Sequence, residues 1–156
     1  MAEEIIEQGY RELADTILEH NPGVDLGRVR AAFELADRAH SGQKRKAGTP
    51  YVTHCVAAAQ ICAEMGLDED SIVAALLHDC IEDTAITHED IARQFGAEVA
   101  DIVEGVTKLT RVQFTSREDE QMENLRKMLM AMAKDIRVIL IKIADRLHNM
   151  PTMEYM

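Results

Sequence analysis

The interpretation of this chain rests on the stretch AALLHDCIEDT, residues 74–84. On a helix each residue advances by roughly 100°, so positions 78, 79, 82 and 83 fall within an arc of roughly 140°. One helix face then carries an imidazole and three carboxylates beside the apolar Leu76, Leu77 and Ile81. Burying so many acids is costly unless something positive neutralises them, and a divalent cation does this. The stretch therefore predicts a metal site on a half-buried helix.

Two residues elsewhere in the chain are suited to complete such a site. His54 lies in another predicted helix, just after a loop, where it can supply a second imidazole. Asp145 lies in the strongly apolar helix predicted over residues 139–147, where an acid without a partner would be badly placed. With His78 and Asp79 they make a set of two histidines and two carboxylates. Mixed nitrogen and oxygen donors suit manganese, iron or zinc, and the residues alone leave all three open.

Glu82 and Asp83 follow the predicted ligands by one helical turn. A bound ion lowers the pKa of its water and prepares hydroxide near neutral pH. Two carboxylates one turn away are candidates for transferring the proton and positioning the water. The alternative is that both acids belong to a solvated helix end.

The loop GQKRKAG, residues 42–48, concentrates positive charge in an acidic chain. Arginine stacks on a flat base and lysine meets phosphate, while glycines allow the backbone to approach a ligand closely. Arg45 and Lys46 in this loop therefore suit an anionic, flat ligand. Such a charge run is also typical of a solvated loop, and it is the metal set that favours the ligand.

The chain reads as helical throughout. Aromatic residues make up only 4% while alanine, leucine, isoleucine and methionine are plentiful, a balance that favours helices. Asp25 is a predicted N-cap, and Thr87 with Asp90 forms a predicted capping box for a short helix that ends at Gly96. Residues 136–143 also fit a buried strand, but the pattern continues without a turn signal and favours helix. The predicted helices cover about 4–20, 25–39, 51–65, 69–79, 87–96, 98–106, 117–133 and 136–150, with a polar loop over 40–50 and a connector over 107–116.

Composition excludes several classes of protein. A length of 156 residues fits one domain with a sizeable core. The net charge of −11 argues against a protein that coats nucleic acid. Cys55, Cys62 and Cys80 are too few and oddly numbered for a disulfide framework, which predicts a reducing cytoplasm. No apolar run approaches a membrane span, and the first residues lack the positive region of a signal peptide.

Four stretches closely resemble the hydrolase domain of the RelA/SpoT (Rel) alarmone enzymes. They are AHSGQKRKAGTPYVTH (39–54), AALLHDCIEDT (74–84), FGAEVADIVEGVTKL (95–109) and ENLRKMLMAMAKDIRVILIKIADRLHNM (123–150). The resemblance covers nearly the whole chain. It implies the all-α helical bundle of the HD domain, with manganese as cofactor. The implied reaction removes pyrophosphate from the 3′ position of ppGpp or pppGpp, the alarmones of the stringent response, and leaves GDP or GTP.

The resemblance also implies roles for individual residues. The family's metal ligands correspond to His54, His78, Asp79 and Asp145, and its catalytic acid pair to Glu82 and Asp83. The residues that flank the guanine base correspond to Arg45 and Lys46, and those near the ribose and phosphates to Asn149 and Thr152. Family members with inactive hydrolase domains lose the His-Asp or Glu-Asp pair. Both pairs are intact here, so the resemblance implies an active enzyme.

Three positions depart from the family pattern. Cys55 stands where proline is usual, which we expect to be neutral. Ala47 replaces a common serine and removes one potential hydrogen bond to substrate. Pro151 stands where a basic residue is usual, and because proline fixes φ, it biases Met150 towards an extended conformation. The last departure bears on the placement of Thr152.

The family sequence continues through more helices after the position of Met156. We therefore expect residues 1–156 to be one HD-type domain shortened at its C-terminal end, within a longer protein that has synthetase and regulatory regions. A short single-domain hydrolase is the alternative. Two other functions stay open, namely an HD phosphohydrolase of another nucleotide and a regulatory domain that binds the alarmone without turning it over. The expected partner is a small guanine nucleotide, with no nucleic acid and no membrane.

Overall fold

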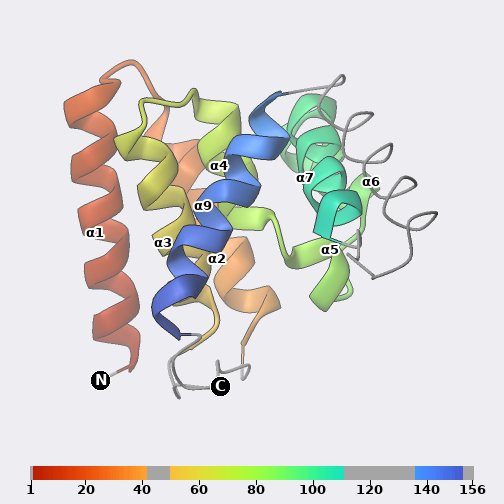
Figure 1. Ribbon diagram of the computed structural model, residues 1–156, viewed down its shortest axis with the longest axis horizontal. Coiled ribbons are helices and arrows are strands. Elements are labelled where there is room, and N and C mark those ends of the chain that lie inside the picture. Colours follow the sequence, from red (N-terminus) through yellow and green to blue (C-terminus); the bar gives the residue numbers. More distant parts are fainter. Residues whose placement is uncertain (1, 42–49, 111–135, 153–156) are drawn as a thin grey trace, which may run out of the picture.

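The elements that the structure describes are all helices. The computed structural model describes residues 2–41, 50–110 and 136–152 (Figure 1). The helices are α1 (Ala2–His20), α2 (Leu26–Ala39), α3 (Val52–Glu64), α4 (Glu69–Leu77), α5 (Cys80–Asp83), α6 (His88–Phe95), α7 (Ala97–Thr110) and α9 (Ile136–Thr152). The predicted all-α class is confirmed over these ranges. The helix predicted over residues 117–133 and most of the basic loop lie outside them.

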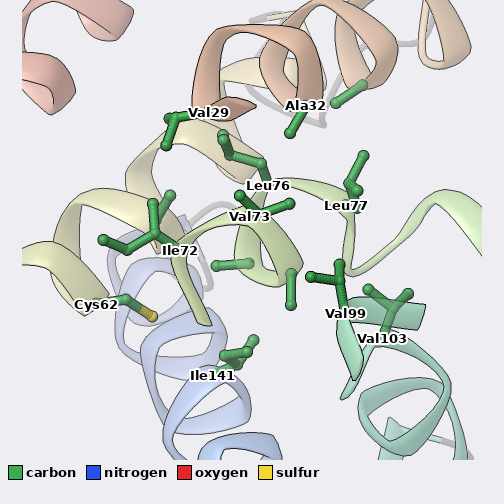
Figure 2. Packing of buried hydrophobic residues seen from close by; sticks show 14 of the residues in the cluster. Val29, Ala32, Cys62, Ile72, Val73, Leu76, Leu77, Val99, Val103 and Ile141 are labelled. Carbon is green, nitrogen blue, oxygen red and sulfur yellow. The ribbon is translucent and has the colours of Figure 1, made fainter. Parts of the chain in front are cut away.

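Helix α4 forms the centre of the hydrophobic core. Every residue from Ser71 to Leu77 is buried, as expected for a helix that is apolar on all sides. Figure 2 shows its side chains, Ile72, Val73, Leu76 and Leu77, surrounded by residues of four other helices. Those neighbours are Val29 and Ala32 of α2, Cys62 of α3, Val99 and Val103 of α7 and Ile141 of α9. The C-terminal end of α4, which leads directly into His78, is therefore held inside the core.

The other helices pack around α4 in two groups. Helix α1 packs against α3, and α3 packs against α9. Helices α6 and α7 pack on each other, and α7 also contacts α4 and α9. Figure 1 accordingly places α1 at the far side of the bundle from α6 and α7, with α9 between them. The side of α9 that packs against α3 and α4 therefore faces the middle of the molecule.

Most helix boundaries follow signals in the local sequence. The side chain of Asp25 accepts hydrogen bonds from the backbone N–H groups of Gly27 and Arg28, so the predicted N-cap is confirmed. Thr87 and Asp90 form the predicted capping box, with both reciprocal hydrogen bonds present. Helix α6 ends at Gly96, whose φ of 101° lies in a region that glycine adopts at little cost.

Two predicted features of the backbone differ from the structure, and one open alternative is settled. The connector expected from Thr107 is helical as far as Thr110, because α7 is longer than predicted; the buried Thr107 hydroxyl donates to the carbonyl of Val103. The extended conformation expected at Met150 is absent, since α9 continues to Thr152. Proline there removes the N–H that would bond the carbonyl four residues earlier, and α9 continues through the position despite this loss. The alternative of a strand over residues 136–143 is excluded by α9.

Two contacts fix α9 against its neighbours. Arg137 donates to Oδ2 of Asp68 at 2.8 Å and to Oε1 of Glu98 at 2.5 Å, which joins the first turn of α9 to the start of α4 and of α7. A Cβ atom built on Gly105 of α7 would lie 2.7 Å from Cγ2 of Val138, so the two helices approach too closely for a larger residue. Among the described residues, no helix is both long enough and apolar enough to cross a membrane.

Candidate metal centre

His78 is oriented by the end of α4. Its Nδ1–H donates to the carbonyl oxygen of Ala75 at 2.6 Å, which places Nε2 on the opposite side of the ring. Nε2 lies 3.1 Å from Oδ2 of Asp79 and 3.2 Å from Oδ1 of Asp145. A histidine whose other ring nitrogen is fixed by a backbone carbonyl has a defined tautomer, with Nε2 available as a ligand.

The prediction of one continuous helix through residues 78–83 is wrong. Helix α4 ends at Leu77, His78 and Asp79 form a turn, and α5 begins at Cys80. The imidazole of His78 binds the Ala75 carbonyl, the acceptor that a continuous helix would offer to the backbone N–H of Asp79. This side chain therefore competes with the helical hydrogen bond at the point where the helix stops.

His54 enters the site from the first turn of α3. Its side chain is buried, and its ring meets that of His78 edge to face with centroids 5.5 Å apart. Nε2 of His54 lies 2.5 Å from Oδ1 of Asp145 and 4.0 Å from Oδ2 of Asp79. The two imidazoles thus converge on the same two carboxylates.

Asp145 is the contribution of α9. Its Oδ1 faces both imidazoles, and its Oδ2 accepts from Nζ of Lys142 at 2.9 Å, one turn earlier on the same helix. The side chain is only 7% exposed. An acid in this apolar helix therefore has cationic or protonated partners on both oxygens, as its surroundings require.

Asp79 faces His78 from within the turn. Its Oδ2 also accepts a hydrogen bond from the phenol O–H of Tyr51 at 2.8 Å. Ligand atoms of all four residues lie within 4.8 Å of one another. The four residues predicted from the sequence as one set are therefore brought together from α3, the turn after α4, and α9. Two imidazole nitrogens and two carboxylate oxygens at this spacing fit a single transition-metal ion.

The two carboxylates among these four side chains favour a positive charge at the centre of the site. Burial would lower the pKa of His78, but Asp79 and Asp145 outweigh it and raise that pKa to about 10. Burial would raise the pKa of Asp79, yet His78 and the hydroxyl of Tyr51 bring it down to about 2. The pKa of Asp145 is also held well below its usual range against burial, by hydrogen bonds with His54 and His78. Both carboxylates are thus ionised at neutral pH, and they keep on His78 a proton that a bound cation can replace.

Three residues next to the ligands escaped prediction from the sequence. Tyr51 and Lys142 hold one carboxylate each, and His40, expected in a polar loop, is buried and stacks on Tyr51 with ring centroids 4.6 Å apart. The contact of Lys142 with Asp145 could have been predicted from the sequence, because a lysine and an acid three residues apart on a helix are neighbours. No local pattern indicates the contacts of His40 and Tyr51, since they join segments that only the fold brings together.

The remaining predicted site residues stay predictions. Arg45 and Lys46 lie outside the described residues. Glu82 and Asp83 belong to the backbone of α5, and Asn149 and Thr152 to the end of α9, but the structure does not describe their side chains. The backbone of α5 begins directly after Asp79, and Asn149 follows Asp145 by one helical turn.

A second group of metal-binding side chains lies on the surface. Nε2 of His88 on α6 is 2.9 Å from Oδ1 of Asp101 and 3.5 Å from Oε2 of Glu104, both on α7. Asp101 is exposed while His88 and Glu104 are half-buried, and ion pairs this open to solvent contribute little and are screened by salt. The buried set around His78 is therefore the candidate metal centre.

Comparison with known proteins places this geometry in a family. Residues 32–156 match the family model described as HD domain. The chain is 51% identical over 144 residues to the bifunctional (p)ppGpp synthase/hydrolase SpoT of Escherichia coli K12, covering 92% of this chain and 20% of that protein. It is 49% identical to a GTP pyrophosphokinase of Myxococcus xanthus, covering 90% of this chain and 19% of that protein. The chain thus spans about a fifth of the length of these curated relatives.

A solved structure supports the same assignment. It is that of a metazoan ortholog of SpoT, described as hydrolysing ppGpp and playing a role in starvation responses. The two structures superpose with a TM-score of 0.65 at 32% sequence identity. The match covers 82% of this chain and 71% of the other, so both the fold and most of its length are shared.

Proposed function

The chain belongs to the HD-domain family and, within it, to the hydrolase domains of the RelA/SpoT proteins, and on this premise we propose that it hydrolyses the 3′-pyrophosphate of (p)ppGpp. The observation that carries the proposal is the buried set of two histidines and two aspartates whose ligand atoms lie within 4.8 Å. The products are pyrophosphate and GDP or GTP. Relatives named as guanosine-3′,5′-bis(diphosphate) 3′-pyrophosphohydrolases support the choice of reaction.

Membership of the HD family implies a divalent metal, and the residues present fit one. We propose that His54, His78, Asp79 and Asp145 hold manganese. Imidazole and carboxylate donors suit this ion, and the described residues of the set include no thiolate of the kind that structural zinc sites usually recruit. A divalent ion supplies a Lewis acid and a means of activating water near neutral pH.

The chain's own residues divide the remaining work. In the proposed reaction water adds to the phosphorus next to the ribose, the bond from that phosphorus to the 3′ oxygen breaks, and the ribose regains its 3′ hydroxyl. Glu82 and Asp83 transfer the proton of the attacking water and position it. Their place directly after the Asp79 turn supports this role, because α5 begins there.

The substrate is a small guanine nucleotide. We propose that Arg45 and Lys46 flank the guanine base and that Asn149 and Thr152 bind near the ribose and phosphates. The position of Asn149 one turn after Asp145 supports the second pair. Cys55, Cys62 and Cys80 are too few and oddly numbered for a disulfide framework, which supports a location in the reducing cytoplasm.

The first test is release of pyrophosphate from ppGpp by the purified chain. We expect release that depends on added manganese and that chelation with EDTA abolishes. GTP and dGTP, assayed in parallel, distinguish the alarmone from other nucleotides, and we expect much slower turnover of both. Tight binding of ppGpp without any release at saturating manganese would instead support a regulatory domain.

A further inference from the structure

Tyr51 contacts two of the four proposed ligands, although no step of the reaction requires it. It is the residue before α3, three positions ahead of His54. Its phenol O–H donates to Oδ2 of Asp79 at 2.8 Å, and its ring lies edge-on to that of His54, with centroids 6.0 Å apart. One side chain thus touches ligands from two separate elements.

The oxygen that Tyr51 binds is the one that faces the centre. Oδ2 of Asp79 lies 3.1 Å from Nε2 of His78 and 4.0 Å from Nε2 of His54. A carboxylate that can rotate must lose this freedom when it binds an ion, which weakens binding. A hydrogen bond to the ligating oxygen removes the freedom beforehand. A neutral phenol achieves this without bringing a second positive charge to the site.

Tyr51 is itself held in place by His40. The two rings stack with centroids 4.6 Å apart and an angle of 28° between their planes. His40 is 2% exposed and follows the end of α2, where its backbone N–H donates to the carbonyl of Ala36 at 3.0 Å. Its Nε2 lies 3.9 Å from Sγ of Cys80, the residue after Asp79. The direction of the phenol O–H is therefore set by buried neighbours.

We propose that Tyr51 is a positioning residue whose hydroxyl holds the Asp79 carboxylate in the orientation that binds the metal. The inference rests on the proposed function, because it assumes that Asp79 is a ligand. A packing role would need only the ring, whereas a positioning role needs the hydroxyl. Replacing tyrosine by phenylalanine separates the two, since the ring and its stacking on His40 remain.

The experiment compares manganese binding by the full chain and by its Tyr51→Phe variant, using titration calorimetry without nucleotide. Partners that orient metal ligands typically contribute about 10–100-fold to affinity, so we expect the variant to bind manganese about tenfold more weakly or worse. At saturating manganese, turnover of ppGpp should recover to within a few-fold of the parent, because the reacting groups are unchanged.

Tyr10→Phe is the matched control. Tyr10 is also half-buried, its hydroxyl donates to the carbonyl of Leu26 at 3.4 Å, and its ring packs on Phe33 with centroids 4.9 Å apart. It therefore loses an equivalent hydroxyl at a place remote from the ligands. We expect the manganese affinity of Tyr10→Phe to equal that of the parent, and both variants to remain folded in EDTA at the temperature of the titration.

Each outcome has a definite meaning. Equal affinities of the parent and Tyr51→Phe would overturn the positioning role and leave the proposed function intact. An equal loss of manganese affinity in Tyr10→Phe would also overturn it, because the loss would then follow from removing any half-buried tyrosine hydroxyl. Absence of manganese binding by the parent would overturn the proposed function and the inference together.

Discussion

At the scale of single residues, His78, Asp79 and Asp145 are each held by an anchor outside the set of proposed ligands. The carbonyl of Ala75 fixes His78, the hydroxyl of Tyr51 fixes Asp79, and the ammonium of Lys142 fixes Asp145. At His78 and Asp145 the anchor binds the atom that faces away from the other ligands. At Asp79 it binds the oxygen that faces them and restrains it. Ligands held in this way lose little conformational freedom on binding an ion, so the site is pre-organised.

Removing one carboxylate from the centre should abolish metal binding and hydrolysis together. We predict this outcome for Asp79→Ala and for Asp145→Ala, because each supplies an oxygen that faces both imidazoles. Calorimetry with manganese and pyrophosphate release from ppGpp measure the two losses. Asp101→Ala, which removes an acid from the surface group with His88, is the control and should behave as the parent. Unchanged activity of Asp79→Ala would refute the metal assignment.

Glu82→Ala should separate metal binding from turnover. If Glu82 transfers a proton and is not a ligand, manganese affinity stays at the parent's value while kcat falls by about 10²–10⁴. Calorimetry and steady-state kinetics on the same sample provide both numbers. Glu89→Ala, which alters an exposed glutamate at the start of α6, should change neither. A parallel loss of manganese affinity in Glu82→Ala would instead indicate that Glu82 is a metal ligand.

At the scale of helices, the boundaries that depend on signals within a few residues were predicted from the sequence. The boundary that depends on a contact between distant residues was missed. Asp25, Thr87 and Gly96 act through hydrogen bonds or backbone angles close in sequence, and each prediction is confirmed. The break after Leu77 was missed because it depends on the imidazole of His78, which binds a carbonyl while facing Asp145 sixty-seven residues away. Helical periodicity carries no information about such competition.

The candidate centre was predictable for a different reason. Charged side chains inside apolar segments, such as Asp145 in α9, must find partners, and this requirement identifies the set from the amino-acid sequence alone. The requirement does not say which neutral groups support the partners. Tyr51 lies at the junction of a predicted loop and helix, and its neighbour His40 was expected in a polar loop, so neither could be assigned a role from the sequence.

Two glycines within helices should respond in opposite ways to substitution by alanine. Gly105→Ala would place Cβ 2.7 Å from Cγ2 of Val138, a buried β-branched side chain with little freedom to move. We expect it to lower the free energy of unfolding by about 1–3 kcal/mol. Gly9→Ala in α1 would meet Val56 at an ordinary 3.5 Å and should raise that free energy by about 0.5–1 kcal/mol. Urea unfolding measures both, and a stable Gly105→Ala variant would contradict the close approach.

At the scale of the whole molecule, the centre joins parts of the chain that are far apart in sequence. Its proposed ligands come from α3, the turn after α4 and α9, while α4 connects the same helices through the core. Because unfolding separates the ligands, an ion that binds the folded chain must stabilise it. Metal binding and global stability are therefore linked.

Manganese should accordingly raise the unfolding midpoint of the parent. At a free concentration of about 100 times Kd, the added stability is about 2.7 kcal/mol. Thermal unfolding with EDTA and with manganese measures the difference. Asp145→Ala should lose the effect and Asp101→Ala should keep it. An equal rise in Asp145→Ala would attribute the stabilisation to the surface group around His88.

A buried thiol should make the fold sensitive to alkaline pH. Burial raises the pKa of Cys62 from 9.0 to about 12. Between these values the unfolded chain releases the proton while the folded chain retains it, so stability falls as pH rises above about 9. At about pH 10 the loss is about 1 kcal/mol. Between neutral pH and pH 10, the free energy of unfolding of Cys62→Ala should therefore fall by about 1 kcal/mol less than that of the parent, as measured by urea unfolding. An identical pH dependence of the two proteins would contradict this assignment.

The order of the ligands along the chain has a consequence for protein synthesis. Asp145 lies sixty-seven residues after His78 and ninety-one after His54. At about 5–20 residues per second, the ribosome adds Asp145 about 3–13 s after His78. Throughout that interval the nascent chain holds three ligands and lacks the fourth. The proposed metal centre therefore cannot be completed before α9 has emerged and folded against α3, so translation itself delays the point at which the chain can bind its ion.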